Sequence, residues 1–162
     1  MSYEKYCELI DQIHTQYGLP DSELKYENCN LMLLDVPFTL AHGGQKHPNK
    51  LLVFCDFGEP PEEDRAAILA KVLEGNMELF AEDAGHFAIN AETGHVLLMV
   101  KLSLEDIVTD SVMPVLMMYA GIATEWGKTH FLRPMELPDE NGIFHPAYTA
   151  NDPSTVTGAE PH

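Results

Sequence analysis

The sequence has little positive charge. Its 162 residues contain nine Lys and Arg against 26 Asp and Glu, which gives a formal net charge of −17 at pH 7. A nucleic-acid-binding surface needs clustered Lys and Arg side chains to neutralise phosphates, and the few bases here are scattered. The same charge is repelled by anionic membrane surfaces. We therefore expect neither nucleic acid nor anionic lipid as a partner, although a strong acidic excess keeps a protein in solution even when it exposes apolar patches.

Long apolar runs and paired cysteines are also absent. No run reaches the roughly 20 apolar residues that a helix needs to cross a bilayer. The start, MSYEKYCELIDQIH, lacks the cationic and then apolar segments of a secretory signal. Cys7, Cys29 and Cys55 are odd in number and far apart, without a CxxC pair. This pattern indicates reduced, buried thiols in a cytoplasmic protein that does not insert into membranes.

Motifs for catalysis and metal binding are missing as well. The chain has no GxSxG, HExxH or HxxxH spacing, and no cysteine has an obvious base nearby in the sequence. Eight histidines are present; His42 and His47 flank an expected loop, and His86 and His95 lie on expected strands. We interpret them as surface or cross-strand residues, with a metal-dependent enzyme as the remaining alternative. The sequence therefore predicts no catalytic residue, no metal ligand and no cofactor.

Helical periodicity is present in three stretches. In the first, an apolar stripe at helical spacing predicts a helix over about 3–17, which Gly18 and Pro20 end. The second begins at Pro61 with carboxylates in its first turn and continues to about residue 80, with an apolar face broader than one sheet contact needs. The third is expected over about 112–127, with Pro114 either in the first turn of a new helix or at a kink in a continuing one.

Strand patterns fill the spaces between these helices. We expect strands over 31–36, 38–42 and 51–57, separated by Pro37 and the loop GGQKHPN, and antiparallel because their connections are too short for parallel crossovers. Residues 87–102 predict a hairpin that turns around 92–94. The expected fold is α+β: a twisted antiparallel sheet of about five strands packed with three helices, in the order α-β-β-β-α-β-β-α. This domain spans residues 1–127, and residues 128–162, which hold five of the 11 prolines, form a proline-rich tail.

Two segments carry a family resemblance. LAKVLEGNMELF and AINAETGHVLLMVKLSLED resemble the leucine-rich helix, the hairpin and the leucine-acidic entry to the last helix of the class I type III secretion chaperones, the Tir chaperone (CesT-like) family. The resemblance covers residues 51–126 and extends weakly over the first helix. The proline-rich tail departs from the family pattern.

The resemblance implies a non-enzymatic chaperone in the bacterial cytoplasm. Such a protein is a homodimer that keeps the chaperone-binding segment of a type III secreted effector unfolded, without ATP or metal. The middle helix and a neighbouring strand form much of the two-fold contact in this family. Here that implies a dimer interface made by Ile68, Val72, Leu79, Val96 and Leu98.

The client surface is expected on the first helix and the first strands. An extended client needs edge amides for pairing and apolar pockets for alternate side chains, and this region has short, interrupted strands. The alternative is that most of these residues fill the core. A second functional alternative is a regulatory or adaptor domain of the same fold that has no secreted client. The candidate partner-binding residues are Ile13, Tyr17, Leu33, Phe38 and Leu40.

Overall fold

The computed structural model describes residues 2–107 and 109–133. Three helices and five strands alternate along the chain in the expected order. They are α1 (Ser2–Tyr17), β1 (Cys29–Leu33), β2 (Val36–His42), β3 (Lys50–Gly58), a 3-10 turn (Glu62–Asp64), α2 (Arg65–Ala81), β4 (His86–Ile89), β5 (Val96–Ser103) and α3 (Thr109–Thr129).

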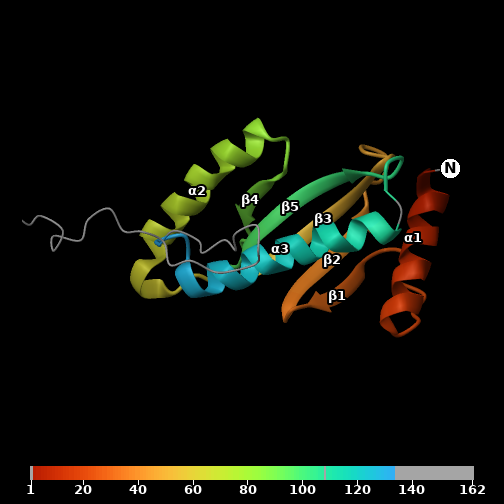
Figure 1. The fold of residues 1–162 in the computed structure, drawn as a ribbon, viewed down its shortest axis with the longest axis horizontal. Coiled ribbons are helices and arrows are strands. Elements are labelled where there is room, and N and C mark those ends of the chain that lie inside the picture. The colour runs from red at the N-terminus through yellow and green to blue at the C-terminus, as the bar shows by residue number, and fades with distance from the viewer. Residues whose placement is uncertain (1, 108, 134–162) are drawn as a thin grey trace, which may run out of the picture.

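All five strands belong to one antiparallel sheet (Figure 1). Their order across the sheet is β1-β2-β3-β5-β4, so β3 and β5 lie at the centre although α2 and β4 separate them in the chain. The predicted α+β class, the three helices and the five-stranded antiparallel sheet are confirmed.

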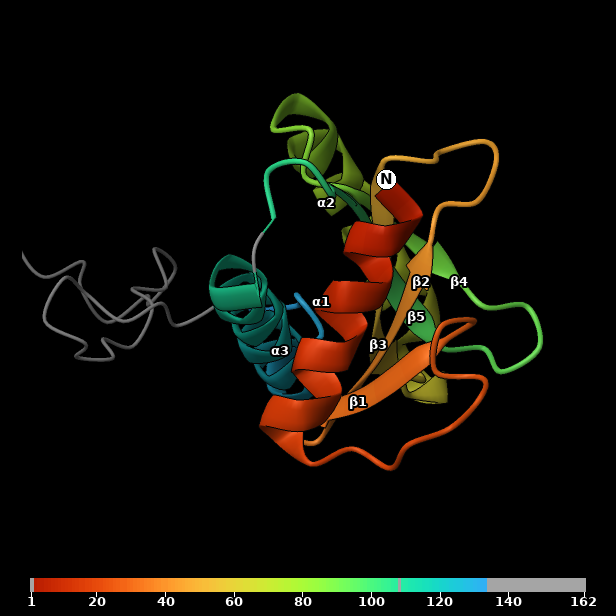
Figure 2. The same cartoon turned by 90° about the vertical axis from the view of Figure 1, so that its right-hand side faces the viewer.

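The sheet buries one face. Residues of β3 alternate, with Leu51, Val53, Cys55 and Phe57 buried and their neighbours half-buried. Figure 2 shows α1 and α3 on the same side of the sheet, and the buried residues of both helices join one core cluster with the inward residues of the strands. The period-2 alternation of the strands and the helical stripes therefore meet in a single core.

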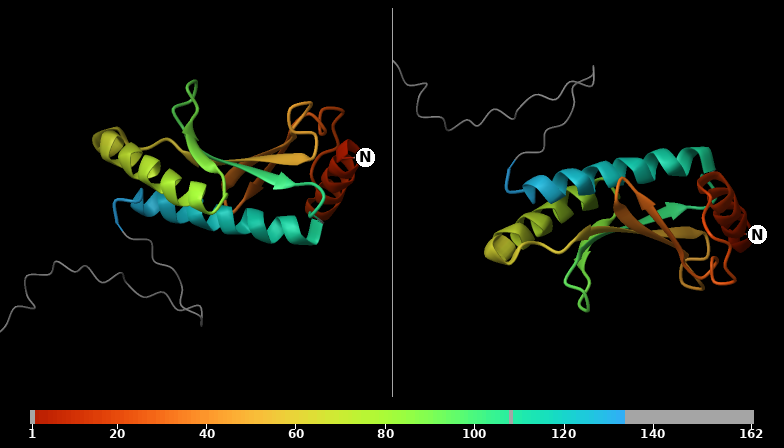
Figure 3. Two further views of the ribbon diagram at one scale, coloured as in Figure 1. Left: turned by 90° about the horizontal axis from the view of Figure 1, so that it is seen from above. Right: turned by 90° about the horizontal axis from the view of Figure 1, so that it is seen from below.

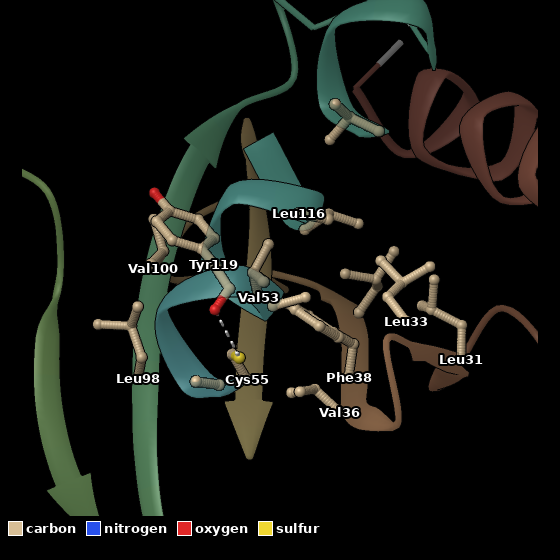
Figure 4. Packing of buried hydrophobic residues seen from close by; sticks show 14 of the residues in the cluster. Leu31, Leu33, Val36, Phe38, Val53, Cys55, Leu98, Val100, Leu116 and Tyr119 are labelled. Carbon is tan, nitrogen blue, oxygen red and sulfur yellow. Dashed lines mark hydrogen bonds between the residues drawn. The ribbon is translucent and has the colours of Figure 1, made fainter. Parts of the chain in front are cut away.

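Figure 4 shows the middle of this core, where α3 packs on β3. The side chains of Leu116 and Tyr119 lie over the buried residues of the strands. The Cys55 thiol donates a weak hydrogen bond to the Tyr119 carbonyl at 4.0 Å. Burial raises the pKa of the Cys55 thiol to about 12, with Asp56 adding to the effect, so this cysteine remains a neutral thiol.

Several element boundaries differ from the expected ones. The first strand does not continue to Val36; it ends at Leu33, and residues 34 and 35 form a two-residue turn. Pro37 does not break a strand, because it lies within β2 before the ladder to β3 begins at Phe38, where a missing amide costs no ladder bond. Helix α3 starts at Thr109, before the expected residue 112, so Pro114 lies within a continuing helix, which is the second of its two expected placements.

The β4–β5 hairpin turns where the sequence predicts. Gly94 adopts a φ of 74°, and its N–H donates to the Asn90 carbonyl at 2.8 Å. At the other end of the domain, α3 continues to Thr129, two residues beyond the expected boundary at 127. The predicted tail lies outside the described residues from position 134 onward.

Candidate partner-binding surfaces

Strand β1 forms one edge of the sheet. Its register with β2 places Leu33 opposite Val36 across the two-residue turn, and Leu31 opposite Phe38. Because hydrogen-bonded and non-bonded pairs alternate in an antiparallel ladder, Leu31 and Leu33 direct their N–H and C=O groups to β2. Met32 directs its N–H and C=O outward, and so does Asn30. No strand of the described chain pairs with this side of β1.

Charged and polar contacts fix the loop that leads from α1 into β1. Lys25, in the loop between α1 and β1, contacts Asp11 at 2.8 Å and Asp21 at 2.9 Å, and the Tyr26 hydroxyl donates to Asp11 at 2.8 Å. The hydrogen bonds from Lys25 and Tyr26 lower the pKa of Asp11. The loop is thereby fastened to α1, and it delivers the chain into β1 at a fixed place.

Exposed apolar side chains accompany this open edge. Met32 is 60% exposed on β1, and Leu34 is 56% exposed in the turn that follows. Leu34 and Asp35 have φ angles of 51° and 62°, a left-handed conformation that leucine rarely adopts. Leu24, just before β1, is also exposed. The edge therefore offers outward backbone groups with apolar side chains at both of its ends.

The opposite edge of the sheet is closed. The Asn76 side chain of α2 accepts from the Phe87 N–H at 2.6 Å and donates to the Phe87 carbonyl at 3.2 Å. One amide side chain thus satisfies both outward backbone groups of a residue in the middle of β4, as a neighbouring strand would. Within the described chain, β1 has no comparable side-chain cap on its outward backbone groups.

Helix α2 carries a second apolar surface. Leu73, Met77 and Phe80 are spaced at i, i+4 and i+7 and are 69%, 77% and 86% exposed. They lie along one side of the helix, while Ile68 and Val72 are buried on another. We call these three residues the α2 outer stripe. A solvent-exposed stripe of this size is typical of a surface that contacts another protein.

A hollow of about 520 Å³ lies between the end of α2 and the sheet face that α1 and α3 leave uncovered. Leu52, Phe54 and Met99 contribute half-buried apolar side chains to its lining. Lys101, His47 and His86 also line it, as does one carboxylate, Asp83, and the Lys101 ammonium contacts the His47 ring nitrogen at 3.2 Å. Figure 3 shows α2 standing away from the sheet on the side next to β4 and β5.

Four of the five predicted partner-binding residues lie in the core. Ile13, Leu33, Phe38 and Leu40 are buried, while Tyr17 is 42% exposed at the end of α1. The structure brings all except Tyr17 into one cluster behind β1 and β2. Sequence reasoning missed Met32 and Leu34, which alternate with the buried residues of the same hairpin. Nothing in the structure tests whether any of these residues contacts a partner, so the site remains a prediction.

The predicted dimer residues are also mostly internal. Ile68, Val72, Val96 and Leu98 belong to the core of the protomer, and Leu79 packs against it half-buried. The helical period contained the missing signal: the apolar residues of α2 divide into one set that faces β4 and a second set, the α2 outer stripe, about a third of a turn away. The dimer itself also remains a prediction.

The described residues contain no group of three or more His, Cys, Asp or Glu side chains that could hold a metal ion. His42 is engaged within its own loop, where its Nε2 contacts the Pro48 carbonyl at 2.8 Å and its Nδ1 accepts from the Gly44 N–H at 3.1 Å. His95 contacts Asp56 at 2.9 Å across the sheet. Within the described part of the chain, no helix is long and apolar enough to cross a bilayer.

Two solved structures contain chains with a similar fold. A chain in the crystal structure of the ExsC–ExsE complex has a TM-score of 0.61 and 21% identity, and the match covers 75% of this chain and 90% of that one. A chain in the structure of the HopA1–SchA chaperone–effector complex has a TM-score of 0.59 and 14% identity, covering 79% of this chain and 97% of that one. These likenesses establish the fold. No curated protein sequence matches the chain.

The family follows from the sequence match. The profile of the Tir chaperone protein (CesT) family matches residues 8–126, and the chain belongs to this family. The resemblance inferred from the two sequence segments is confirmed. The family is one of chaperones rather than enzymes.

Proposed function

We propose that this protein is a type III secretion chaperone that binds an extended segment of a secreted effector in the bacterial cytoplasm and keeps it unfolded. Membership of the Tir chaperone family supports the proposal. It is also supported by the shared fold with a chaperone–effector complex. Binding by a preformed surface needs no catalysis, and the proposed function uses none.

The observation that carries the proposal is the open edge of β1. An effector segment in an extended conformation can pair with the outward N–H and C=O groups of Met32 and Asn30, which adds a sixth strand to the sheet. Met32 and Leu34 then provide apolar contacts on either side of the added strand. The closed edge at β4 restricts such pairing to one side of the sheet.

The predicted partner residues take different parts in this proposal. Tyr17 is exposed at the end of α1 and can contact the client directly. Leu33, Phe38 and Leu40 are buried, and they support the client site by fixing β1 and β2 against the helices. The contact surface proposed here is therefore Met32, Leu34 and Tyr17, together with the backbone of β1.

We also propose that the protein is a homodimer through the α2 outer stripe. A two-fold interface must be self-complementary, and the three residues of the stripe, spread over two helical turns, can pack against the same stripe of a second copy. The five residues predicted from the family resemblance would then support the interface from inside the protomer. Burial of this stripe removes the largest exposed apolar side chains of α2 from water.

A proline substitution tests strand addition. Met32→Pro removes the outward N–H without affecting the ladder to β2, because edge strands tolerate proline at such positions. Met32→Ala is the matched control, since it removes the side chain and keeps the N–H. The client for this assay is a secreted protein encoded by a neighbouring open reading frame and coexpressed with the chain.

We expect Met32→Pro to bind the client at least about tenfold more weakly than Met32→Ala, from one lost hydrogen bond of about 1 kcal/mol together with the clash of the pyrrolidine ring. Circular dichroism and sedimentation should show the parental fold and assembly for both variants. Equal client binding by the two variants would show that the client does not pair with β1. A partner that binds but is never secreted would favour the adaptor alternative.

A further inference from the structure

Strand β1 is held in the sheet from one side only. It has five residues, and β2 is its only neighbour among the strands of the described chain. The turn that follows it contains Leu34 in a left-handed backbone conformation that leucine rarely adopts. A strand held in this way fluctuates more than a central one, so the order of β1 depends on what holds its other end.

A network of four side chains holds that end. The Nζ atom of Lys25 lies 2.8 Å from Oδ1 of Asp11 and 2.9 Å from Oδ1 of Asp21. It also lies over the Tyr26 ring, 5.0 Å from the ring centroid. The Tyr26 hydroxyl donates to the same Asp11 oxygen at 2.8 Å. We call Asp11, Asp21, Lys25 and Tyr26 the Lys25 network, because the other three members all contact this lysine.

The Lys25 network differs from the ion pairs within helices. Lys71 with Glu74 and Lys128 with Glu125 each join side chains three positions apart on one helix, and exposed pairs of this kind contribute little to stability. Lys25 instead joins α1 to the loop before β1, and its side chain is only 17% exposed. Charges that share partners in a network interact more strongly than isolated pairs. The network therefore fixes the position of one segment against another.

A second contact with α1 lies at the first residue of β1. The Sγ atom of Cys29 lies 3.6 Å from Nε2 of His14, which is one turn beyond Asp11 on the helix. The backbone hydrogen bonds of loop 18–28 in the described chain stay within the loop or return to His14, and none of them reaches β1. These contacts thus fix where β1 begins without using its outward N–H and C=O groups.

We propose that Lys25 is a positioning residue for client binding, which holds the β1 edge in place before the client arrives. The inference rests on the proposed function, because it assumes that the client pairs with β1. A strand that is already ordered loses little conformational freedom on binding, so the client is bound more tightly. Lys25 acts through the position of β1 and not through a contact with the client.

Nuclear magnetic relaxation of the ¹⁵N-labelled protein alone tests the effect on the strand. Lys25→Met keeps an unbranched side chain and removes the ammonium. We expect the order parameters of the Asn30 and Met32 amides to fall from about 0.85, typical of rigid backbone, to about 0.6. The amide of Val53 on the central strand β3 should keep its parental value. Asp21→Asn weakens one of the two carboxylate contacts, so this milder variant should give a smaller decrease.

Client affinity then tests the coupling, with the same coexpressed client as for the Met32 variants. We expect Lys25→Met to bind the client about fivefold more weakly than the parent protein, because the client must then restrict the motion of β1 itself. The amide spectra show whether each variant is folded.

Two further variants control for the charge and for the substitution. Lys25→Arg should restore parental order parameters and parental client affinity, because a guanidinium can donate to both carboxylates. Lys128→Met makes the same substitution as Lys25→Met in the ion pair near the end of α3. It should match the parent protein in both measurements.

Three results would overturn the proposal. Parental order parameters of β1 in Lys25→Met would show that the network does not hold the strand, and a decrease at Val53 as well would show that it stabilises the whole fold. A flexible β1 with parental client affinity would remove the role of Lys25 in binding. The Met32 variants distinguish these results from a failure of the proposed function, because weaker binding by Met32→Pro would still support strand addition.

Discussion

At the scale of single residues, the turn between β1 and β2 contains residue types that its backbone conformation does not favour. Two-residue hairpin turns with positive φ at both positions favour Asn-Gly, yet this turn contains Leu34 and Asp35. A left-handed conformation costs a residue with a side chain about 1–2 kcal/mol. An exposed leucine in a strained turn beside an open strand edge is explained if its side chain contributes to partner binding.

Leu34→Asn should therefore raise the stability of the protein while weakening its binding. We expect the free energy of unfolding to increase by about 1 kcal/mol, because asparagine tolerates the left-handed region. Urea denaturation followed by circular dichroism measures it. Leu34→Ala is the control: it removes the side chain and keeps the strain, so it should weaken client binding without the gain in stability. A loss of stability in Leu34→Asn would mean that Leu34 contributes packing that its exposure does not reveal.

The three cysteines should differ in reactivity. Burial raises the pKa of Cys29 to about 11 and, with Asp56, that of Cys55 to about 12, while Cys7 is half-buried on α1. Only the thiolate reacts with disulfide reagents. At pH 8 in the native protein, we expect one thiol to react quickly, and the Cys7→Ser variant to show no fast phase. In denaturant all three should react, and two fast thiols in the native protein would contradict the buried positions.

At the scale of elements, the two edges of the sheet are treated differently. β4 has its middle residue capped by Asn76 of α2, and β1 has no such cap from the described chain. Exposed strand edges invite unwanted pairing, and proteins commonly cover them. This difference between the two edges supports the proposed pairing of a client with β1.

Asn76→Ala should open the closed edge. It leaves the Phe87 N–H and carbonyl without partners, so we expect a loss of about 1–3 kcal/mol in the free energy of unfolding. Asn76→Asp retains an acceptor for the N–H and loses the donor to the carbonyl, so its loss should be smaller. Hydrogen exchange of the Phe87 amide checks the mechanism, since that amide should lose protection in Asn76→Ala. Unchanged protection would show that packing of α2, rather than Asn76, covers the edge.

The elements themselves were predictable because their signals are local. The stripe that ends at Tyr17, the alternation of β3 and the turn at Gly94 each specify type and place from a few neighbouring residues. The sequence placed the client surface on the first helix and the first strands without stating which strand forms the edge, and it did not separate inward from outward residues. Deciding that Phe38 is buried and Met32 exposed requires knowing which side α1 covers, and that is set by contacts far apart in the sequence.

At the scale of the whole molecule, the exposed apolar residues gather at the β1 edge and along the α2 outer stripe, whose Phe80 also lines the hollow. The acidic surface keeps such a protein in solution. The sequence predicted that partners exist and assigned the family. It could not distinguish core from interface on α2, because Val72 and Leu73 are equally apolar and differ only in the direction that the helix gives them.

Met77→Glu should convert the proposed dimer into monomers. A carboxylate in the middle of the α2 outer stripe would be buried without a partner in a two-fold interface. Ala67→Glu is the matched control, because residue 67 is exposed and lies on a different side of α2. Sedimentation velocity should give a monomer for Met77→Glu and the parental species for Ala67→Glu. If both variants keep the parental mass, the stripe is not the interface.

The burial of the single tryptophan has a consequence for the fluorescence of the protein. Trp126 is 1% exposed, its indole N–H has no acceptor in the described part of the chain, and its ring meets the His130 ring edge-on with centroids 4.8 Å apart. The tryptophan fluorescence of the protein therefore comes from one buried side chain near the end of α3. Its emission should be blue and should shift to the red when that end of the helix opens.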